Sequence, residues 1–383
     1  MPNLDQRINI RALSQYKYSC KNLLEGAVMK LSCVFCNRKY LIGEQPQTSS
    51  VRITGSFSIS SGTSLRVQSN QPSAKNCPNC RHPVISAPYP TQSQIPPKVI
   101  LFGAGASAGS TKGKAPPIGD QLFGELATFD PSGWGSISEP LKSAFQSDFE
   151  HGMIQMAQFD ENRLPPLQKS MAAFFFQFIP DGHNLYTQFC ERLKIGNLLI
   201  GLASLNYERL LELAITESGQ DLEICLPHGC CNLFCDGATT DALGSEFPGM
   251  GVTTNGLVYS INDESQFNYK LAHDSFPPVM SYFEPYKRVT SGANFIDEQK
   301  QKWAALCSTA KEIYLIGVKP RLIDSHIWGV LEKTPAKIIY CSRTKGALLF
   351  KEWAQSVNRP PVDLVLDGDF QGEFERICEM IGI

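Results

Sequence analysis

The sequence lacks a long apolar run: the longest apolar stretches are short, such as 98–102 and 197–203. A membrane-spanning helix needs about twenty apolar residues, so no membrane partner is expected. The opening residues, MPNLDQRINIRAL, carry charges that interrupt any apolar segment, which argues against a secretory signal peptide. Charged residues make up 19% of the chain and hydrophobic residues 42%, which excludes the disordered and coiled-coil classes. We therefore expect a globular, cytoplasmic protein.

Cysteine, by contrast, is abundant, with 13 residues. In a chain without an export signal, thiols are expected to be reduced or bound to metal rather than joined in disulfides. Two CxxC pairs, Cys33/Cys36 and Cys77/Cys80, fit the tetrahedral preference of Zn²⁺. Four cysteine ligands leave no open position for catalysis, so the sequence predicts one structural zinc ion in a zinc ribbon.

A length of 383 residues exceeds what one hydrophobic core usually serves, so more than one domain is expected. We predict a small β-rich zinc-ribbon domain over 1–90. Alternating polar and apolar residues in VRITGSFSIS and TSLRVQS add a β-hairpin between its cysteine pairs. A Pro- and Ser-rich linker over 91–97 separates it from a larger domain over 98–383.

Charge is divided unevenly between the two parts. Residues 1–95 carry a net charge of +8 and the remainder −10, although the whole chain carries −2. A basic module favours either a polyanionic partner, such as nucleic acid, or docking against the acidic domain. Both interpretations stay open.

Short apolar segments alternate with amphipathic ones along the larger domain. The strand-like segments are KVILF, NLLIGLAS, LEICLPHG, EIYLIG, KIIYCS and DLVL, with helical segments such as NYERLLELAI and FIDEQKQKWAALCSTA between them. This alternation predicts an α/β fold, with a doubly wound, Rossmann-like, mostly parallel sheet and helices on both faces.

A glycine motif follows the first of these strands. Gly103, Ala104, Gly105 and Ser107 belong to a G-x-G-x-x-A pattern, which lets backbone approach a pyrophosphate at a helix N-terminus. The acidic residue that a dehydrogenase carries about twenty positions later is not evident. The motif therefore favours a dinucleotide but disfavours an ordinary dehydrogenase.

The segments GAGAS, LNYERLLE, LPHG and YLIGVKPRLIDSHI occur in an order that resembles the sirtuin superfamily. The resemblance covers about 97–383 and is nearest to the bacterial sirtuin-like domains of anti-phage defence systems, which hydrolyse NAD. It implies that Gly317 and Ser342 contact NAD together with the glycine motif. It also implies a structural role for Asp324 and His326. Two positions depart from the family pattern, Glu208 in place of Asp and Val318 in place of a hydroxyl residue.

Cleavage of the nicotinamide–ribose bond passes through an oxocarbenium-like sugar, and nicotinamide leaves as a neutral group. The reaction therefore needs a polar group beside the ribose and a base, but no strong acid. Asn206, after a buried strand, fits the first role, although an Asn at this position is often only a helix N-cap. His228, after the next strand, fits the second, because imidazole titrates near neutral pH.

These residues predict an NAD hydrolase, an NAD-depleting effector of anti-phage defence, with NAD as substrate and Asn206 and His228 as catalytic residues. The basic N-terminal domain would sense a nucleic acid or protein trigger or mediate homo-oligomer formation. One alternative is an NAD-dependent protein deacylase, which the absence of a GIPDFR-type segment disfavours. Another is a catalytically weak sensor of NAD or ADP-ribose, which Glu208 and Val318 favour slightly. The last is a nucleic-acid-binding protein in which the ribbon is primary.

Overall fold

The computed structural model describes residues 96–111, 113–159, 163–236, 256–281 and 291–383, and the backbone of five short strands in the N-terminal part of the chain. The strands are β1 (Met29–Cys33), β2 (Lys39–Ile42), β3 (Ser56–Ser58), β4 (Ser64–Arg66), β5 (Val84–Pro88), β6 (Lys98–Phe102), β7 (Ile200–Ser204), β8 (Ile224–Cys225), β9 (Leu233–Cys235), β10 (Val258–Ser260), β11 (Glu312–Ile316), β12 (Lys337–Ser342) and β13 (Leu364–Asp367).

The helices of the first half are α1 (Ala104–Ala108), α2 (Gly119–Phe129), the 3₁₀ turn η3 (Trp134–Ser136), α3 (Glu139–Ser147), α4 (Phe149–Phe159), α5 (Leu164–Phe176) and α6 (Leu185–Gly196). Those of the second half are α7 (Leu210–Glu217), α8 (Glu264–His273), α9 (Ala293–Thr309), α10 (Ser325–Lys333), α11 (Thr344–Ser356) and α12 (Phe370–Ile381).

A six-stranded sheet with the order β13-β12-β11-β6-β7-β8 forms the centre of the domain, and every pairing in it is parallel. Numbered along the chain from β6, this order is the 3-2-1-4-5-6 arrangement of dinucleotide-binding folds. The chain reverses its direction of winding between β6 and β11. The predicted doubly wound parallel sheet is therefore confirmed.

Both faces of this sheet are buried. Successive residues of a strand point to opposite sides, so alternate residues of β6 enter different apolar clusters. Ile100 and Phe102 belong to one buried cluster, and Val99 and Leu101 to the other. The first cluster also contains apolar residues of α6, α7 and α12, and the second those of α9 and α10. The continuous apolar run of β6 follows from this two-sided burial.

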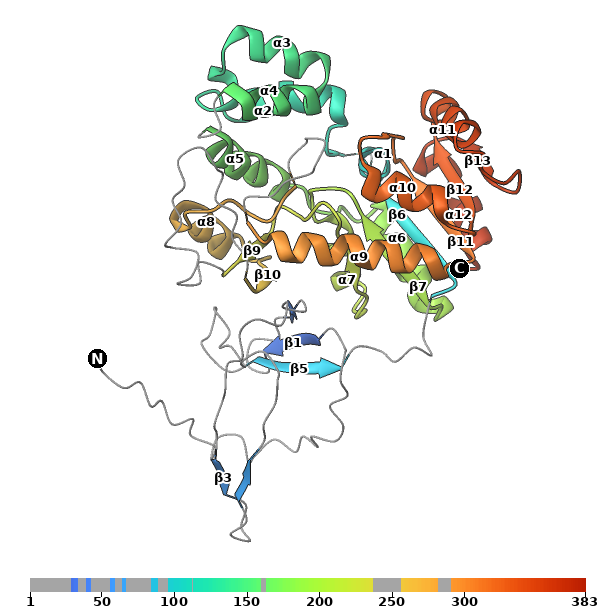
Figure 1. The fold of residues 1–383 in the computed structure, drawn as a ribbon, viewed down its shortest axis with the longest axis horizontal. Helices are drawn as coiled ribbons and strands as arrows, with labels where there is room; N and C mark the ends of the chain where they lie inside the picture. Colours follow the sequence, from blue (N-terminus) through green and yellow to red (C-terminus); the bar gives the residue numbers. More distant parts are fainter. Residues whose placement is uncertain are drawn as a thin grey trace.

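Helices α2, α3, α4 and α5 form a lobe apart from the sheet, in green at the top of Figure 1. Its core is aromatic, with Phe123 stacked on Phe145 and the indole of Trp134 packed edge-on against Phe145. The indole of Trp134 donates a hydrogen bond to the carbonyl of Leu167, 3.2 Å away, and so joins η3 to α5 within the lobe. Among the described residues, no helix combines the length and apolar character needed to cross a membrane.

The N-terminal strands pair among themselves and with the larger domain. β3 and β4 are antiparallel, within the stretch where the alternation predicts a hairpin. β1 pairs with β2 and β5, and β2 pairs with β10. Cys33 ends β1, whereas Cys36, Cys77 and Cys80 lie outside the described residues. The zinc ribbon therefore stays a prediction.

Candidate active site at the carboxyl edge of the sheet

The predicted site residues follow neighbouring strands at one edge of the sheet. Phe102, the last residue of β6, pairs with Ile316 on one side and Ser204 on the other, and Ile316 pairs with Cys341. Gly103, Gly317 and Ser342 therefore follow directly after paired positions of β6, β11 and β12. Asn206 and His228 follow the ends of β7 and β8. Open α/β sheets bind ligands at this carboxyl edge, where the winding reverses.

The glycines of the first loop pack against the loop after β11. The amide of Gly103 donates to the carbonyl of Ile316, 2.9 Å away, and that of Gly105 to the carbonyl of Gly317, 3.0 Å away. A Cβ atom on Gly103 would lie 2.6 Å from the carbonyl oxygen of Gly317. These glycines therefore allow two loops to pack closely, and Ala104 at the start of α1 is exposed.

A buried polar cluster centres on Ser107 of α1. Its hydroxyl oxygen lies 2.8 Å from the phenol oxygen of Tyr186, on α6, and donates to the carboxyl group of Glu208. The side-chain amide of Asn206 donates to the same hydroxyl over 2.8 Å and to the carbonyl of Gly103 over 3.2 Å. The cluster joins α1, α6 and the loop between β7 and α7.

Donor and acceptor capacities fix the direction of these bonds. With Glu208 ionised, the single proton of the Ser107 hydroxyl is used by Glu208, so Tyr186 must be the donor in its bond to Ser107. The bonds to Ser107 and Gly103 use both N–H groups of the Asn206 amide. The remaining atom, Oδ1 of Asn206, is buried and has no hydrogen-bond partner. Asn206 therefore holds an unused hydrogen-bond acceptor in a fixed orientation.

Asn206 is not a helix cap. The helix begins at Leu210, and its N-cap residue is Arg209. The capping contact comes instead from Glu208, whose second carboxyl oxygen accepts from the amide of Leu210. The side chain of Asn206 is 6% exposed and serves the polar cluster. The alternative that the sequence left open for this residue, an N-cap, is therefore wrong.

Burial changes the acidity of two groups in the cluster. It raises the pKa of Glu208, although bonds from Ser107 and the Leu210 amide oppose the shift. It also raises the pKa of Tyr186 well above that of a free phenol, and the nearby charge of Glu208 adds to the effect. Tyr186 therefore stays a neutral hydrogen-bond donor at all physiological pH values.

His228 lies beside Tyr207 and directly contacts a second histidine. Its Nε2 atom is 2.9 Å from Nε2 of His326, which lies in the first turn of α10, directly after the N-cap Asp324 and Ser325. The ring of His228 also faces that of Tyr207, with centroids 6.5 Å apart. The sequence assigned Asp324 and His326 a structural role, and the structure brings both to the predicted base.

The predicted NAD contact Ser342 and the departing position Val318 lie on the other side of the sheet centre. Ser342 ends β12 and is half-buried, next to Tyr340, whose phenol donates to the carbonyl of Val318, 2.6 Å away. Val318 is 3% exposed and packs into the second apolar cluster. The valine side chain therefore contributes to the core rather than to the open edge of the sheet.

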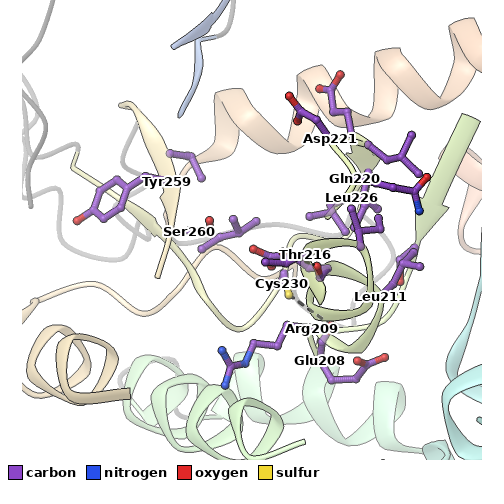
Figure 2. Close-up of a pocket in the computed structure, with 18 of the residues that line it drawn as sticks. Glu208, Arg209, Leu211, Thr216, Gln220, Asp221, Leu226, Cys230, Tyr259 and Ser260 are labelled. Carbon is purple, nitrogen blue, oxygen red and sulfur yellow. Dashed lines mark hydrogen bonds between the residues drawn. The ribbon is translucent and has the colours of Figure 1, made fainter. Parts of the chain in front are cut away.

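A cavity of about 200 Å³ lies beside the polar cluster, between α7, β10 and Phe295 of α9. Figure 2 shows side chains around it, among them Leu211, Thr216 and Tyr259. Glu208 lines it, but Asn206 and His228 do not. Small-molecule sites usually measure about 300–1,000 Å³, so this cavity is not assigned to a dinucleotide.

The described cysteines form no disulfide. Burial raises the pKa of Cys190, Cys225 and Cys341 to about 12, so these thiols stay protonated at neutral pH. They are packing residues rather than nucleophiles.

No protein-family model matches this chain, and no curated protein matches it. Among solved structures, it is similar to a mutant Sir2 homologue in complex with ADP-ribose, with 14% identity and a TM-score of 0.40 over 74% of this chain and 91% of the other. A Sir2 homologue–NAD complex shows 17% identity and a TM-score of 0.37 over 68% and 89% of the two chains. Similarity at this level assigns neither family nor function, so the function has to follow from the chain's own side chains.

Proposed function

We propose that this chain is a sirtuin-like NAD hydrolase, which cleaves NAD to nicotinamide and ADP-ribose at the carboxyl edge of its sheet. The observation that carries the proposal is Oδ1 of Asn206, a buried acceptor without a partner. The amide of Asn206 bonds to Gly103, which follows β6, one of the two strands between which the winding reverses. A buried unpaired acceptor costs about 1–3 kcal/mol, which a ligand that donates a hydrogen bond recovers.

The oriented amide of Asn206 selects the kind of group that binds there. Because both its N–H groups are used within the protein, only a donor can bind the free oxygen. Ribose hydroxyls and water are donors, whereas a phosphate oxygen is not. Asn206 therefore suits the ribose that carries nicotinamide, or the water that attacks it.

His228 supplies the proton acceptor. As the bond from C1′ of the ribose to nicotinamide breaks, the electron pair leaves with nicotinamide, which becomes neutral. A water oxygen then forms the new bond to C1′, and its proton passes to the imidazole of His228. Glu208 is not assigned this role, because Ser107 and the Leu210 amide already bond to its carboxyl oxygens.

Hydrolysis is preferred to protein deacylation because the segment after the glycines reads PPIGDQLFGELA. A deacylating sirtuin carries a GIPDFR-type segment there. PPIG spans the start of α2, because Ile118 is the N-cap of this helix and Gly119 its first residue, and α2 opens the helical lobe.

The test measures, by chromatography, the nicotinamide that the full chain releases from NAD. We expect turnover by the wild type and a loss of about 10²–10⁴-fold in His228→Ala, the usual contribution of a general base. Asn206→Ala should lose about 10²-fold or more. Asn268→Ala and His273→Ala, both exposed on α8, serve as matched controls and should keep wild-type rates.

Two outcomes would contradict the hydrolase. Tight NAD binding by calorimetry without turnover would favour the sensor of NAD or ADP-ribose. Turnover that appears only with an acylated lysine peptide would favour the deacylase.

We further propose that the protein acts in the cytoplasm as an NAD-depleting effector of anti-phage defence. The support is the order of the motifs together with the basic charge of residues 1–95. The N-terminal module, with a zinc ion on Cys33, Cys36, Cys77 and Cys80, would sense a nucleic acid or protein trigger or drive oligomer formation. Nucleic-acid binding that weakens steeply with salt would support a nucleic-acid trigger, and weak, salt-independent binding would contradict it.

A further inference from the structure

Three potential metal ligands, His228, Asp324 and His326, come together from the loop after β8 and the start of α10. Among the described residues they form a cluster whose ligand atoms all lie within 4.8 Å of one another. His228 follows β8, whereas Asp324 and His326 lie where α10 begins, after β11. His228 and Asp324 are each 6% exposed, so the fold holds two of the three side chains in place.

The two imidazole rings face each other through their Nε2 atoms. Their Nε2 atoms are 2.9 Å apart, with ring centroids 5.1 Å apart. Without a metal, one Nε2 must carry a proton and the other a lone pair, so the pair shares one proton. A metal ion replaces that proton and binds both lone pairs. Two nitrogens at the usual Zn–N distance lie about 3.3 Å apart in a tetrahedron, which needs only a small widening.

The carboxyl group of Asp324 is oriented as a third ligand rather than as a helix cap. Asp324 occupies the N-cap position of α10, but its side chain makes no capping hydrogen bond. Two imidazole nitrogens and one carboxylate oxygen suit Zn²⁺ and related transition metals, whereas Mg²⁺ and Ca²⁺ prefer oxygen ligands alone. Three protein ligands leave a fourth position for water.

The charges around the cluster favour a cation. Arg321, in the same loop, pairs with Asp148 at 3.2 Å and Glu150 at 2.6 Å, which balances its positive charge. The positive charge of Arg321 therefore adds little repulsion to a cation bound at the three side chains.

We propose that His228, Asp324 and His326 bind one divalent transition-metal ion of the Zn²⁺ class, and that the bound ion switches the NAD site off. The ion occupies the Nε2 lone pair of His228, so this imidazole no longer accepts a proton there. The binding part of the proposal is independent of the proposed NAD hydrolysis, and the switching part rests on it.

Zinc binding is measured on the full chain after removal of metal with a chelator and equilibrium dialysis against Zn²⁺. We expect the wild type and His273→Gln to bind one more equivalent than His326→Gln. Asp324→Asn, which keeps the side-chain shape, should bind zinc more weakly, by about 10-fold or more. Thiol sites, including any on Cys33, Cys36, Cys77 and Cys80, are common to all four proteins and cancel in the difference.

Equal zinc content in the wild type and His326→Gln, with unchanged affinity in Asp324→Asn, would overturn the metal site. Circular dichroism and thermal unfolding check the fold of both variants. If His326→Gln does not fold, the zinc affinity of Asp324→Asn alone tests the metal site.

The switching part is read as the ratio of NAD cleavage without and with Zn²⁺. We expect this ratio to fall by about 10-fold or more from the wild type to His326→Gln. An extra zinc equivalent in a protein that never cleaves NAD would retain the metal site and reject the hydrolase. Cleavage that Zn²⁺ inhibits equally in both proteins would reject the switch.

Discussion

Gly317 is the residue whose backbone decides whether the two central loops fit together. Its φ of +65° lies in the left-handed region, and a Cβ atom there would be 2.1 Å from the amide nitrogen of Ala106. Only glycine avoids both the strained dihedral and the clash. The loop after β11 and helix α1 are therefore held at a separation that no other residue permits.

Gly317→Ala is expected to destabilise the protein by about 2–4 kcal/mol, from backbone strain and overpacking together. Gly124→Ala is the matched control, because a Cβ atom at Gly124, inside α2, meets nothing within 4 Å. It should stabilise the protein by about 0.5–1 kcal/mol. Denaturant unfolding of both variants measures the difference, and equal effects would contradict the close approach of the loops.

The burial of Glu208 predicts that the stability of the protein depends on pH. Its folded pKa is raised by burial above the ordinary value of 4.5, so its contribution to stability is fully present below that value and is lost as pH rises through the folded pKa. The stability of the wild type relative to Glu208→Gln should therefore fall as the pH rises above 4.5 and through the folded pKa. Urea unfolding across this range measures it. A difference that grows with pH would contradict the buried carboxyl group.

Only part of the candidate site could be predicted from the sequence. Asn206 and His228 follow strands, so their place at the carboxyl edge could be expected from the motif order. The contacts of Tyr186 with Ser107 and of His326 with His228 join segments 79 and 98 positions apart. No local pattern encodes such contacts, because they depend on how helices and loops pack in three dimensions.

At the scale of elements, Arg359 ties α10, β12 and the start of β13 together. Its guanidinium group donates to the carbonyls of Thr334, 2.6 Å away, and Ala336, 2.8 Å away, and pairs with Asp363 at 2.9 Å. Asp363 in turn accepts from the amide of Ile338 in β12. The side chains of Arg359 and Asp363 are only 2% and 8% exposed, so water cannot replace these bonds.

Arg359→Ala should therefore cost about 3–5 kcal/mol, the range for breaking a buried ion pair from one side. Arg376→Ala is the control, because its pair with Glu373 spans 3.5 Å and the arginine is 57% exposed. That variant should lose less than about 1 kcal/mol. Thermal unfolding of the two variants provides the comparison, and a small loss in Arg359→Ala would show that the pair is dispensable.

Regular elements were predictable where apolar runs are continuous and less so elsewhere. The predicted strands KVILF, EIYLIG and KIIYCS are β6, β11 and β12. Helix α11 was not predicted, although Ala347, Phe350 and Trp353 form its buried face at helical spacing. β10 and α8 were not predicted either. β10 is short and gains its order from pairing with strands distant in the chain.

At the scale of the whole molecule, ligand binding and stability are linked. ADP-ribose at about 100 times its Kd should stabilise the protein by about 2.7 kcal/mol, because only the folded state binds it. Asn206→Ala should lose most of this gain relative to its own ligand-free melting temperature, and the control Asn268→Ala should keep it. Differential scanning fluorimetry measures the shift. An equal shift in Asn206→Ala would place the ligand elsewhere.

The two apolar clusters on either side of the sheet also determine what an optical probe reports. The chain has 4 tryptophans, and all are buried. Trp303, Trp328 and Trp353 belong to the cluster packed against α9, α10 and α11, whereas Trp134 belongs to the other cluster, in the helical lobe. Intrinsic emission is thus weighted towards one face of the sheet. Loosening of the helical lobe would therefore leave most of the tryptophan fluorescence unchanged. In a Trp134→Phe variant, the remaining fluorescence would report only on the cluster packed against α9, α10 and α11.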